Sequence, residues 1–218
     1  MRVCAIIAAA GSGSRMGVGK NKLLLSVNGK TVIERTIERY EESSVIDAII
    51  VVTADEKIKS IAEKYEKVIK VLRGGDTRQK SVYEGIVAAE GYDIVAVHDG
   101  ARCLISDKVI QEAVTGAKEH GACVPIVDVV DTLKKVKQNK ICDSIDREEV
   151  KAIQTPQCFE RGLLLKAYIT ADGSETDESS LVSKISPVHT CGGDRNNIKI
   201  TTKFDLILAK AILEGGDF

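Results

Sequence analysis

The sequence predicts an α/β protein in which a largely parallel β-sheet is covered by helices on both faces. Apolar runs of strand length alternate along the chain with stretches whose apolar residues recur at the period of a helix. The apolar runs are nearly continuous, which is typical of strands buried on both faces of a parallel sheet. A length of 218 residues, with 44% hydrophobic and 29% charged residues, suits a single domain, which we expect to span residues 1–218.

The alternation is clearest before residue 128. Strands are predicted at residues 3–8, 48–53, 68–72, 94–97 and 122–127, and helices at about 31–42, 55–66, 78–90 and 106–119. In a parallel sheet the loops that follow the carboxyl ends of the strands build the active site. Polar clusters follow the first, third and fourth of these strands, so we expect the functional site there.

The pattern changes at Asp128, where a polar hairpin is predicted. Two strands at 129–137 and 140–146 flank Gln138-Asn139, and they are too exposed in character to belong to the main sheet. We therefore expect a protruding arm at about 129–147. It is either an edge hairpin folded on its own subunit or, as we favour, a dimerisation arm. After it we expect a helix at about 160–170, a helix start at 176–180, a strand near 185–190 and a last helix at 203–213.

Composition excludes several classes of function. The 31 basic and 32 acidic residues nearly cancel, so the chain as a whole produces no field that would attract nucleic acid or an anionic membrane. No apolar run approaches the length of a membrane span. The apolar start is short and continues into a glycine-rich loop, so we interpret it as a first strand and expect a cytoplasmic protein. None of the six cysteines has the C-x-x-C spacing of a zinc or redox motif, and we expect reduced thiols.

The loop after the first strand is the most informative segment. Residues 11–16 read Gly-Ser-Gly-Ser-Arg-Met, and Lys20 and Lys22 follow. Small residues let backbone N–H groups approach an anion closely, and the arginine and lysines place positive charge beside it. Met16 stands where a dinucleotide-binding loop needs Gly or Ala, and Gly-Lys-Asn at 19–21 does not match the end of a P-loop. The loop therefore suits the triphosphate of a nucleotide that is being cleaved, and a simple tight turn is the alternative.

A second cluster reads Gly-Gly-Asp-Thr-Arg-Gln-Lys-Ser at 74–81, after a predicted strand and at the start of a helix. Paired glycines permit close backbone approach, and Asp76 or Thr77 can cap the helix so that its N-terminal amides face a ligand. A capped turn with an exposed Arg78 is equally compatible with this pattern.

A third cluster, Val-His-Asp-Gly-Ala-Arg at 97–102, again stands at the carboxyl end of a strand. Asp99 beside Arg102 suits a Mg²⁺ ligand next to a cation that binds phosphate. A buried Asp–Arg pair is the structural alternative.

Further short segments complete the pattern: Asp-Thr at 131–132, Asp-Arg at 146–147, Gln-Thr-Pro-Gln at 154–157, Thr-Asp-Glu at 176–178 and Asn-Asn-Ile-Lys-Ile-Thr at 196–201. In order and spacing, these motifs and the three clusters resemble those of the 2-C-methyl-D-erythritol 4-phosphate cytidylyltransferases. The resemblance extends from Ala5 to the C-terminal helix. The chain departs from the family at Cys103, where proline is frequent, and at Gly100, where alanine is frequent. Neither position needs a side chain for the chemistry.

The resemblance implies a Rossmann-like sheet of the nucleotide-diphospho-sugar transferase type and a reaction of the non-mevalonate isoprenoid pathway. In that reaction the cytidylyl group of CTP passes to 2-C-methyl-D-erythritol 4-phosphate and pyrophosphate leaves. The acceptor phosphate is already ionised at pH 7, so catalysis would consist of overcoming repulsion between two anions and stabilising the developing charge. The resemblance also implies Mg²⁺ or another divalent cation as cofactor and a homodimer joined by the arm.

The same resemblance assigns roles residue by residue. The catalytic cations would be Arg15, Lys22, Arg147 and Lys199. CTP would be bound by Ala8, Ala9, Ala10, Gly11, Ser12, Gly13, Gly75, Asp76, Arg78, Ser81 and Gly100. The acceptor would be bound by Asp99, Arg102, Thr132, Thr155 and Thr176, and Asp99 would also meet the metal. The family places part of the arm and the Thr176 segment near the site of the partner subunit.

Two other functions compete with this interpretation. A ribitol-5-phosphate cytidylyltransferase would share the CTP half of the site, but the form of the third cluster and Asp-Arg at 146–147 favour methylerythritol phosphate. A non-catalytic nucleotide-sensing relative would lack some of the catalytic cations, and all four are present. A dinucleotide-dependent oxidoreductase is excluded by Met16.

Overall fold

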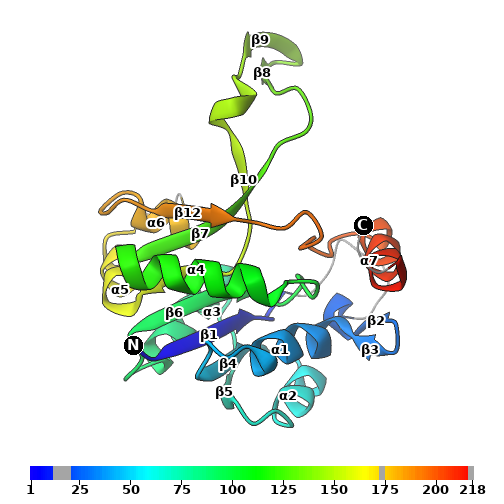
Figure 1. Cartoon of the computed structure of the whole chain (residues 1–218), viewed down its shortest axis with the longest axis vertical. Helices are drawn as coiled ribbons and strands as arrows, with labels where there is room; N and C mark the ends of the chain where they lie inside the picture. Colours follow the sequence, from blue (N-terminus) through cyan, green and yellow to red (C-terminus); the bar gives the residue numbers. More distant parts are fainter. Residues whose placement is uncertain (12–20, 172–174, 216–218) are drawn as a thin grey trace.

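The computed structural model describes residues 1–11, 21–171 and 175–215. In this part of the chain the main sheet has eight strands: β1 (Val3–Ala8), β4 (Ala48–Val52), β5 (Val68–Leu72), β6 (Ile94–Asp99), β7 (Ala122–Asp128), β10 (Lys151–Ile153), β11 (Gln157–Glu160) and β12 (His189–Gly192). β1 pairs in parallel with both β4 and β6, and β4 pairs in parallel with β5 (Figure 1). The predicted parallel core of the sheet is therefore confirmed, and its carboxyl ends meet at one edge.

Two short strands run against this direction, and the sequence analysis did not predict them. β11 pairs antiparallel with both β6 and β7, and β10 pairs antiparallel with β7. β12, which lies slightly later than the strand expected near 185–190, pairs in parallel with β7. The sheet is therefore mixed on the β7 side, although the strands that carry the predicted clusters are parallel.

Helices cover both faces of the sheet, as predicted. Residues that alternate along β1 face opposite sides of the sheet. Val3, Ala5 and Ile7 belong to the hydrophobic cluster on one face, and Cys4 and Ile6 belong to the cluster on the other face. The first cluster includes residues of α1 (Val32–Glu42), α2 (Glu56–Ala62) and α4 (Asp107–His120). The second includes residues of α3 (Arg78–Ala88), α5 (Arg161–Ile169) and α6 (Glu178–Val182). α2 is shorter than the helix expected at 55–66.

The remaining elements are peripheral. η2 (Lys22–Leu24), β2 (Ser26–Val27) and β3 (Lys30–Thr31) lead into α1, and α7 (Lys203–Gly215) ends the described chain. Thr31 and Glu34 form a reciprocal capping box that fixes the start of α1. No helix in the described ranges is long and apolar enough to cross a membrane.

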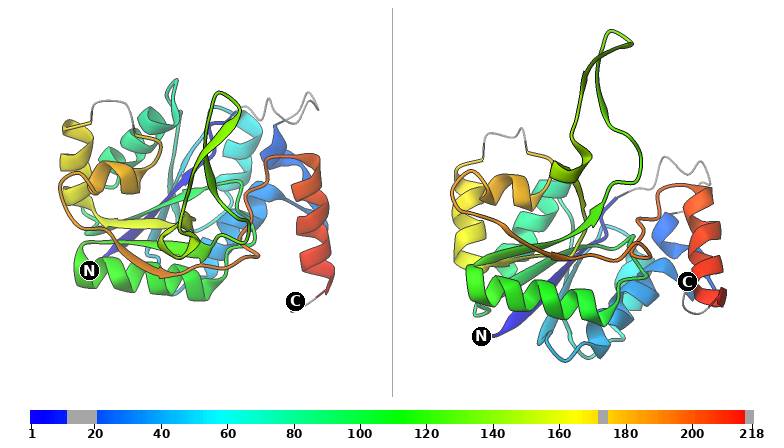
Figure 2. Two further views of the ribbon diagram at one scale, coloured as in Figure 1. Left: turned by 90° about the horizontal axis from the view of Figure 1, so that it is seen from above. Right: turned by 45° about the horizontal axis from the view of Figure 1, so that its top comes forward.

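The predicted arm projects away from the sheet (Figure 2). It is formed by β8 (Lys134–Lys137) and β9 (Lys140–Ser144), which pair with each other in a separate two-stranded sheet. Gln138 and Asn139 have φ values of 47° and 60°, so they form the tight turn that matches the twist of a hairpin. Both strands are exposed along their whole length and are shorter than the predicted runs. η3 (Arg147–Glu149) stands where the arm returns to the domain.

Candidate active site

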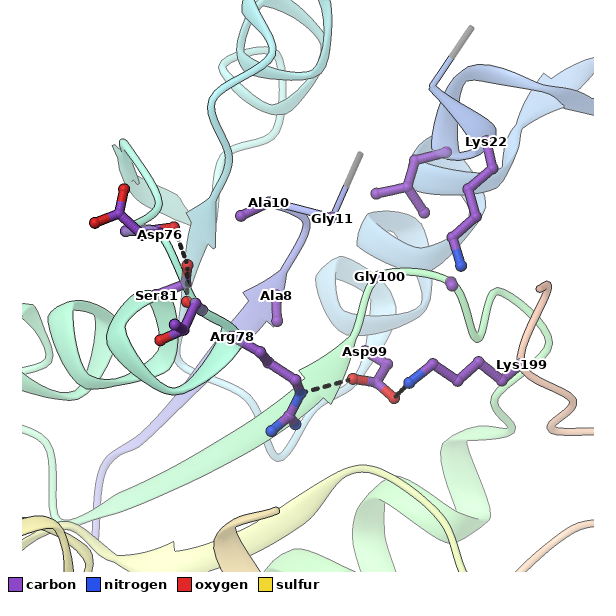
Figure 3. Close-up of a pocket in the computed structure, with 14 residues that line it drawn as sticks. Ala8, Ala10, Gly11, Lys22, Asp76, Arg78, Ser81, Asp99, Gly100 and Lys199 are labelled. Atoms are coloured by element: carbon purple, nitrogen blue, oxygen red, sulfur yellow. Dashed lines mark hydrogen bonds and ion pairs between the residues drawn. The ribbon is translucent and has the colours of Figure 1, made fainter. Parts of the chain in front are cut away.

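A cavity of about 490 Å³ opens at the carboxyl edge of the parallel strands (Figure 3). The loops after β1, β5 and β6 meet there, as the sequence predicted, and two lysines join them from elsewhere in the chain. Its lining residues are Ala8, Ala10, Gly11, Lys22, Leu23, Gly75, Asp76, Thr77, Arg78, Ser81, Asp99, Gly100, Ala101 and Lys199. Most of the described residues predicted to bind CTP therefore line one cavity. Leu23, Thr77 and Ala101 were not predicted.

Glycine at two positions lets these loops approach one another. A Cβ atom on Gly74 would lie 2.5 Å from the Cβ of Ala10 and 2.9 Å from the Oγ of Ser81. The Gly100 amide donates to the Ala8 carbonyl over 3.0 Å, and a Cβ on Gly100 would lie 3.1 Å from the same oxygen. Small residues therefore let these loops pack closely around the cavity, which suits close approach of an anionic ligand.

Asp99, the last residue of β6, lies among three cations. Its Oδ2 is 2.7 Å from Lys199 Nζ and 3.9 Å from Arg102 Nε, and its Oδ1 is 3.4 Å from Arg78 Nε. Burial by itself would raise the pKa of this carboxyl, but Lys199 and then Arg78 outweigh burial and lower the pKa to about 2. Asp99 is therefore an anion that holds cations from three separate segments in place.

Arg78 begins α3 and is fixed by a second carboxylate. Its Nη1 and Nη2 donate to the two oxygens of Glu178 over 2.8 and 2.9 Å, and Glu178 is fully buried. The hydroxyl of Tyr168 donates to the same carboxylate over 3.1 Å. Sequence reasoning used Thr-Asp-Glu at 176–178 only as a helix start and a family motif, and it missed the role of Glu178 in positioning Arg78.

Lys22 reaches the loop that carries Lys199. Its Nζ donates to the Ile200 carbonyl over 2.7 Å, and the Ile200 amide donates to the Ala101 carbonyl over 2.9 Å. Both ammonium groups therefore belong to one wall of the cavity, opposite the start of α3 (Figure 3). This wall brings together two segments that are 178 residues apart in the sequence.

Two predicted acceptor ligands lie behind the cavity wall instead of lining it. The Thr155 hydroxyl accepts from the Asp99 amide over 3.2 Å and lies 3.0 Å from Nδ1 of His98. Burial lowers the pKa of His98 to about 4, so the ring is neutral at pH 7. Its Nε2 lies 3.1 Å from the Arg102 carbonyl, which can only accept, so the single ring proton is on Nε2 and Nδ1 accepts from the Thr155 hydroxyl. The Arg102 Nη1 donates to the Asn197 carbonyl over 2.6 Å. In this conformation both side chains hold the walls that present Asp99 and Lys199.

The arm residues do not reach this cavity within the same chain. Arg147 lines a separate cavity of about 240 Å³ at the base of the arm, and its Nη1 donates to the Val130 carbonyl over 3.2 Å. Thr132 is exposed on the arm, and Thr176 is exposed just before α6.

The remaining predicted residues belong to the loop after β1. The Ala9 side chain is buried and does not line the cavity, and the Ala9 amide donates to the Val52 carbonyl. Ser12, Gly13 and Arg15 lie outside the described residues.

The described residues contain no group of three or more His, Cys, Asp or Glu side chains that could hold a metal ion. Asp99 is the predicted metal ligand, and it is a single carboxylate. Mg²⁺ is commonly bound by one or two carboxylates together with the phosphates of a substrate. These residues therefore suit a cation that arrives with a nucleotide better than one held by protein alone.

Comparison with known proteins gives the family. The model of IspD, 2-C-methyl-D-erythritol 4-phosphate cytidylyltransferase, matches residues 3–215. This chain belongs to that family. The family's Bacillus mycoides protein is 40% identical over 217 residues, covering 95% of this chain and 96% of its own. Its Clostridium novyi protein is 37% identical over 222 residues, covering 97% and 96%.

Solved structures of the family have the same fold. The crystal structure of 4-diphosphocytidyl-2C-methyl-D-erythritol synthase from Anaerococcus prevotii matches with a TM-score of 0.87 and 30% identity, covering 98% of this chain and 96% of that one. That of the cytidylyltransferase from Thermus thermophilus matches with a TM-score of 0.80 and 30% identity, covering 96% and 98%. The family assigned from short motifs is thus confirmed over nearly the full chain.

Proposed function

We propose that this chain transfers the cytidylyl group of CTP to 2-C-methyl-D-erythritol 4-phosphate, a step of isoprenoid biosynthesis that yields 4-diphosphocytidyl-2-C-methyl-D-erythritol and pyrophosphate. Family membership over residues 3–215 supports the reaction. The observation that carries the proposal is the convergence of Lys22, Arg78 and Lys199 on one cavity whose lining includes several glycines. Such a cavity suits a polyphosphate, since amides and cations together replace its water shell.

The proposed chemistry needs charge stabilisation and no general base. An ionised oxygen of the acceptor phosphate attacks the α-phosphorus of CTP in line. The bond from that phosphorus to the bridging oxygen breaks, and pyrophosphate leaves with the electron pair. Lys22, with Arg15, is proposed to stabilise charge on the α-phosphoryl oxygens and the leaving group. Lys199 is proposed to orient the attacking phosphate.

Ligand binding would rearrange the ion pairs of the site. Lys199 is bound to Asp99 in the structure, over 2.7 Å. An incoming phosphate dianion would compete for this ammonium group, and Asp99 would then be available to a divalent cation that arrives with CTP. Mg²⁺ held by Asp99 and phosphate oxygens would neutralise charge on the triphosphate. The backbone of Gly75 and the Ser81 side chain are proposed to hold the nucleoside half.

The acceptor half of the site is proposed to be completed by a second copy of the chain. Arg147 and Thr132 belong to the arm, outside the cavity that holds Lys199. An arm that reaches a second subunit would bring both residues to that subunit's cavity in a homodimer with two equivalent sites. We also propose that the enzyme acts in the cytoplasm on small substrates. The nearly balanced charge of the chain supports the part of this proposal that leaves out nucleic acid and anionic membranes as partners.

A pyrophosphate-release assay tests the proposal. The purified chain is incubated with CTP and Mg²⁺ and with either 2-C-methyl-D-erythritol 4-phosphate or ribitol 5-phosphate. We expect turnover that depends on the first acceptor and is much slower with the second. Equal or faster turnover with ribitol 5-phosphate would reassign the acceptor, and no release with either would contradict the proposed function.

A further inference from the structure

Gln154 is a buried polar residue to which the sequence motifs assign no role. It directly follows β10, and its backbone N–H donates to the Pro125 carbonyl over 2.9 Å, which continues the pairing of β10 with β7. The residue is only 7% exposed. A buried amide side chain costs free energy unless its donor and acceptor groups are hydrogen-bonded. The partners of Gln154 therefore indicate what its side chain holds in place.

The partners of the Gln154 side chain lie in the segment 193–197, which follows β12. Its Nε2 donates to the Asp194 carbonyl over 2.8 Å, and its Oε1 accepts from the Asp194 backbone N–H over 3.2 Å. The same Oε1 accepts from Nδ2 of the buried Asn197 over 3.3 Å. The side-chain amide of Gln154 thus pairs with the backbone of Asp194 as a neighbouring strand would.

This contact requires a glycine at position 193. A Cβ atom on Gly193 would lie 2.9 Å from Gln154 Oε1 and 2.7 Å from the Ile126 carbonyl oxygen. The Gly193 N–H donates to the same carbonyl over 2.8 Å. The segment 193–197 is therefore pressed onto β7 and onto the Gln154 side chain at the same time.

The segment held by Gln154 leads to Lys199, on the way from β12 to α7 (Figure 1). Lys199 reaches into the larger cavity, where its Nζ lies 2.7 Å from Asp99 (Figure 3). On the far side of Lys199, the Ile200 N–H donates to the Ala101 carbonyl over 2.9 Å. The backbone is thus held before and after Lys199, and the Gln154 contacts are part of what holds it before Lys199.

We propose that Gln154 is a positioning residue, which holds the backbone that presents Lys199 to the phosphate of the acceptor. This inference rests on the proposed function and on the role of Lys199 in it. A lysine has a flexible four-carbon stem, so its ammonium group orients a phosphate well only if the backbone that carries it is fixed. Gln154 does not line the larger cavity, so it acts through Lys199.

Steady-state kinetics of Gln154→Met test this role, because methionine keeps the length of the side chain and removes its hydrogen bonds to the segment. We expect KM for 2-C-methyl-D-erythritol 4-phosphate to rise about fivefold, while KM for CTP stays unchanged. Gln154→Asn is one methylene too short for both contacts with Asp194. It should behave in the same way, and it stays polar if methionine destabilises the fold.

The matched control is Gln111→Met, which makes the same change at an exposed position on α4. It should change neither KM value.

A double-mutant cycle separates a role through Lys199 from a general structural role. Lys199→Gln should itself raise KM for the acceptor, and the addition of Gln154→Met should then raise it no further. Equal effects of Gln154→Met in the two backgrounds would overturn the proposal, and so would an equal rise in KM for both substrates.

Hydrogen exchange of the chain without substrates gives a readout that does not depend on activity. In Gln154→Met the amides of Asn197 and Ile200 should exchange faster, while those of β1 should keep their exchange rates. Unchanged exchange at both positions would overturn the positioning role. A failure of the proposed function differs from this outcome, since the unaltered chain would then show no acceptor-dependent turnover, and exchange would still decide whether Gln154 holds the segment.

Discussion

At the scale of single residues, the site is a set of cations held in place by buried carboxylates. Asp99 engages Lys199, Arg78 and Arg102, and Glu178 engages Arg78 a second time. Burying these charges is tolerated because each carboxylate has cationic partners. Arg78 and Arg102 are thereby positioned before any ligand arrives, which is the condition for efficient electrostatic stabilisation of a transition state.

The loss of one catalytic cation should reduce turnover more than nucleotide binding. We expect Lys22→Ala to lower kcat about a hundredfold, or roughly 3 kcal/mol, because a cation at developing charge acts mainly in the transition state. CTP affinity, measured by titration calorimetry, should change far less. Lys57→Ala, an exposed lysine on α2, is the control. Near-normal kcat with only a raised KM for CTP would refute the transition-state role.

The ionisation of Asp99 should appear in the pH dependence of stability. Its pKa is lowered from 3.8 to about 2 in the folded chain, so its ionised form stabilises the fold above about pH 4. This contribution, on the order of 2 kcal/mol, is lost as the pH falls from about 4 to about 2. Urea unfolding of the unaltered chain and of Asp99→Asn should therefore differ at pH 7 and converge near pH 2. A difference that is the same at both pH values would show that the Asp99 charge does not stabilise the fold.

At the scale of elements, helix starts and strand ends do most of the positioning. α3 begins at Arg78, and β6 ends at Asp99, so one ion pair joins a helix N-terminus to a strand carboxyl end. The sequence could predict both elements, because their apolar patterns are long and their ends carry glycine and capping residues. It could not predict the pairing of Arg78 with Glu178, which is a hundred residues away and depends on how α6 packs near α3.

The short strands β10 and β11 could not be predicted from the sequence either. β11 has four residues and directly follows Pro156, and its pairing with both β6 and β7 arises from topology rather than from its own pattern. By contrast, the turn at Gln138-Asn139 could be placed from sequence, because two polar residues between strand-like runs favour a tight hairpin.

Removing the charge of Glu178 should loosen α3 from α6. We expect Glu178→Gln to reduce the free energy of unfolding by about 3 kcal/mol, because the Arg78 guanidinium would lose the nearer of its two buried counter-charges and keep only Asp99. CTP affinity should also fall, since Arg78 lines the cavity. Thermal unfolding and titration calorimetry measure the two effects, and Glu63→Gln on the exposed surface is the control. An unchanged melting temperature would show that the Arg78–Glu178 pair does not stabilise the domain.

At the scale of the whole molecule, the arm separates residues that the family resemblance assigns to one site. Lys199 lies in the larger cavity, and Arg147 lies at the base of an arm that projects from the domain (Figure 2). Val136 and Ile141 on the arm are 58% and 70% exposed, which is costly for a hairpin that packs against nothing. A second subunit would cover them and supply Arg147 to its neighbour's cavity.

Shortening the arm should therefore separate the subunits. A variant in which residues 134–144 are replaced by a short glycine linker should sediment as a monomer. Acceptor use should fall strongly, while CTP binding in the larger cavity should persist. Replacement of Lys137 and Lys140 by alanine at the arm tip controls for loss of local charge. A fully active monomer would contradict the dimer arm.

Complementation between two inactive variants tests the composite site most directly. Lys22→Ala damages the cavity of its own subunit, and Arg147→Ala is proposed to damage the cavity of its partner. When the two variants are mixed and allowed to exchange subunits, half of the dimers combine one of each, and each such dimer has one intact site. We predict that pyrophosphate release from CTP and 2-C-methyl-D-erythritol 4-phosphate recovers to about a quarter of the unaltered rate. A mixture that remains as inactive as its components after exchange would contradict a site shared between subunits.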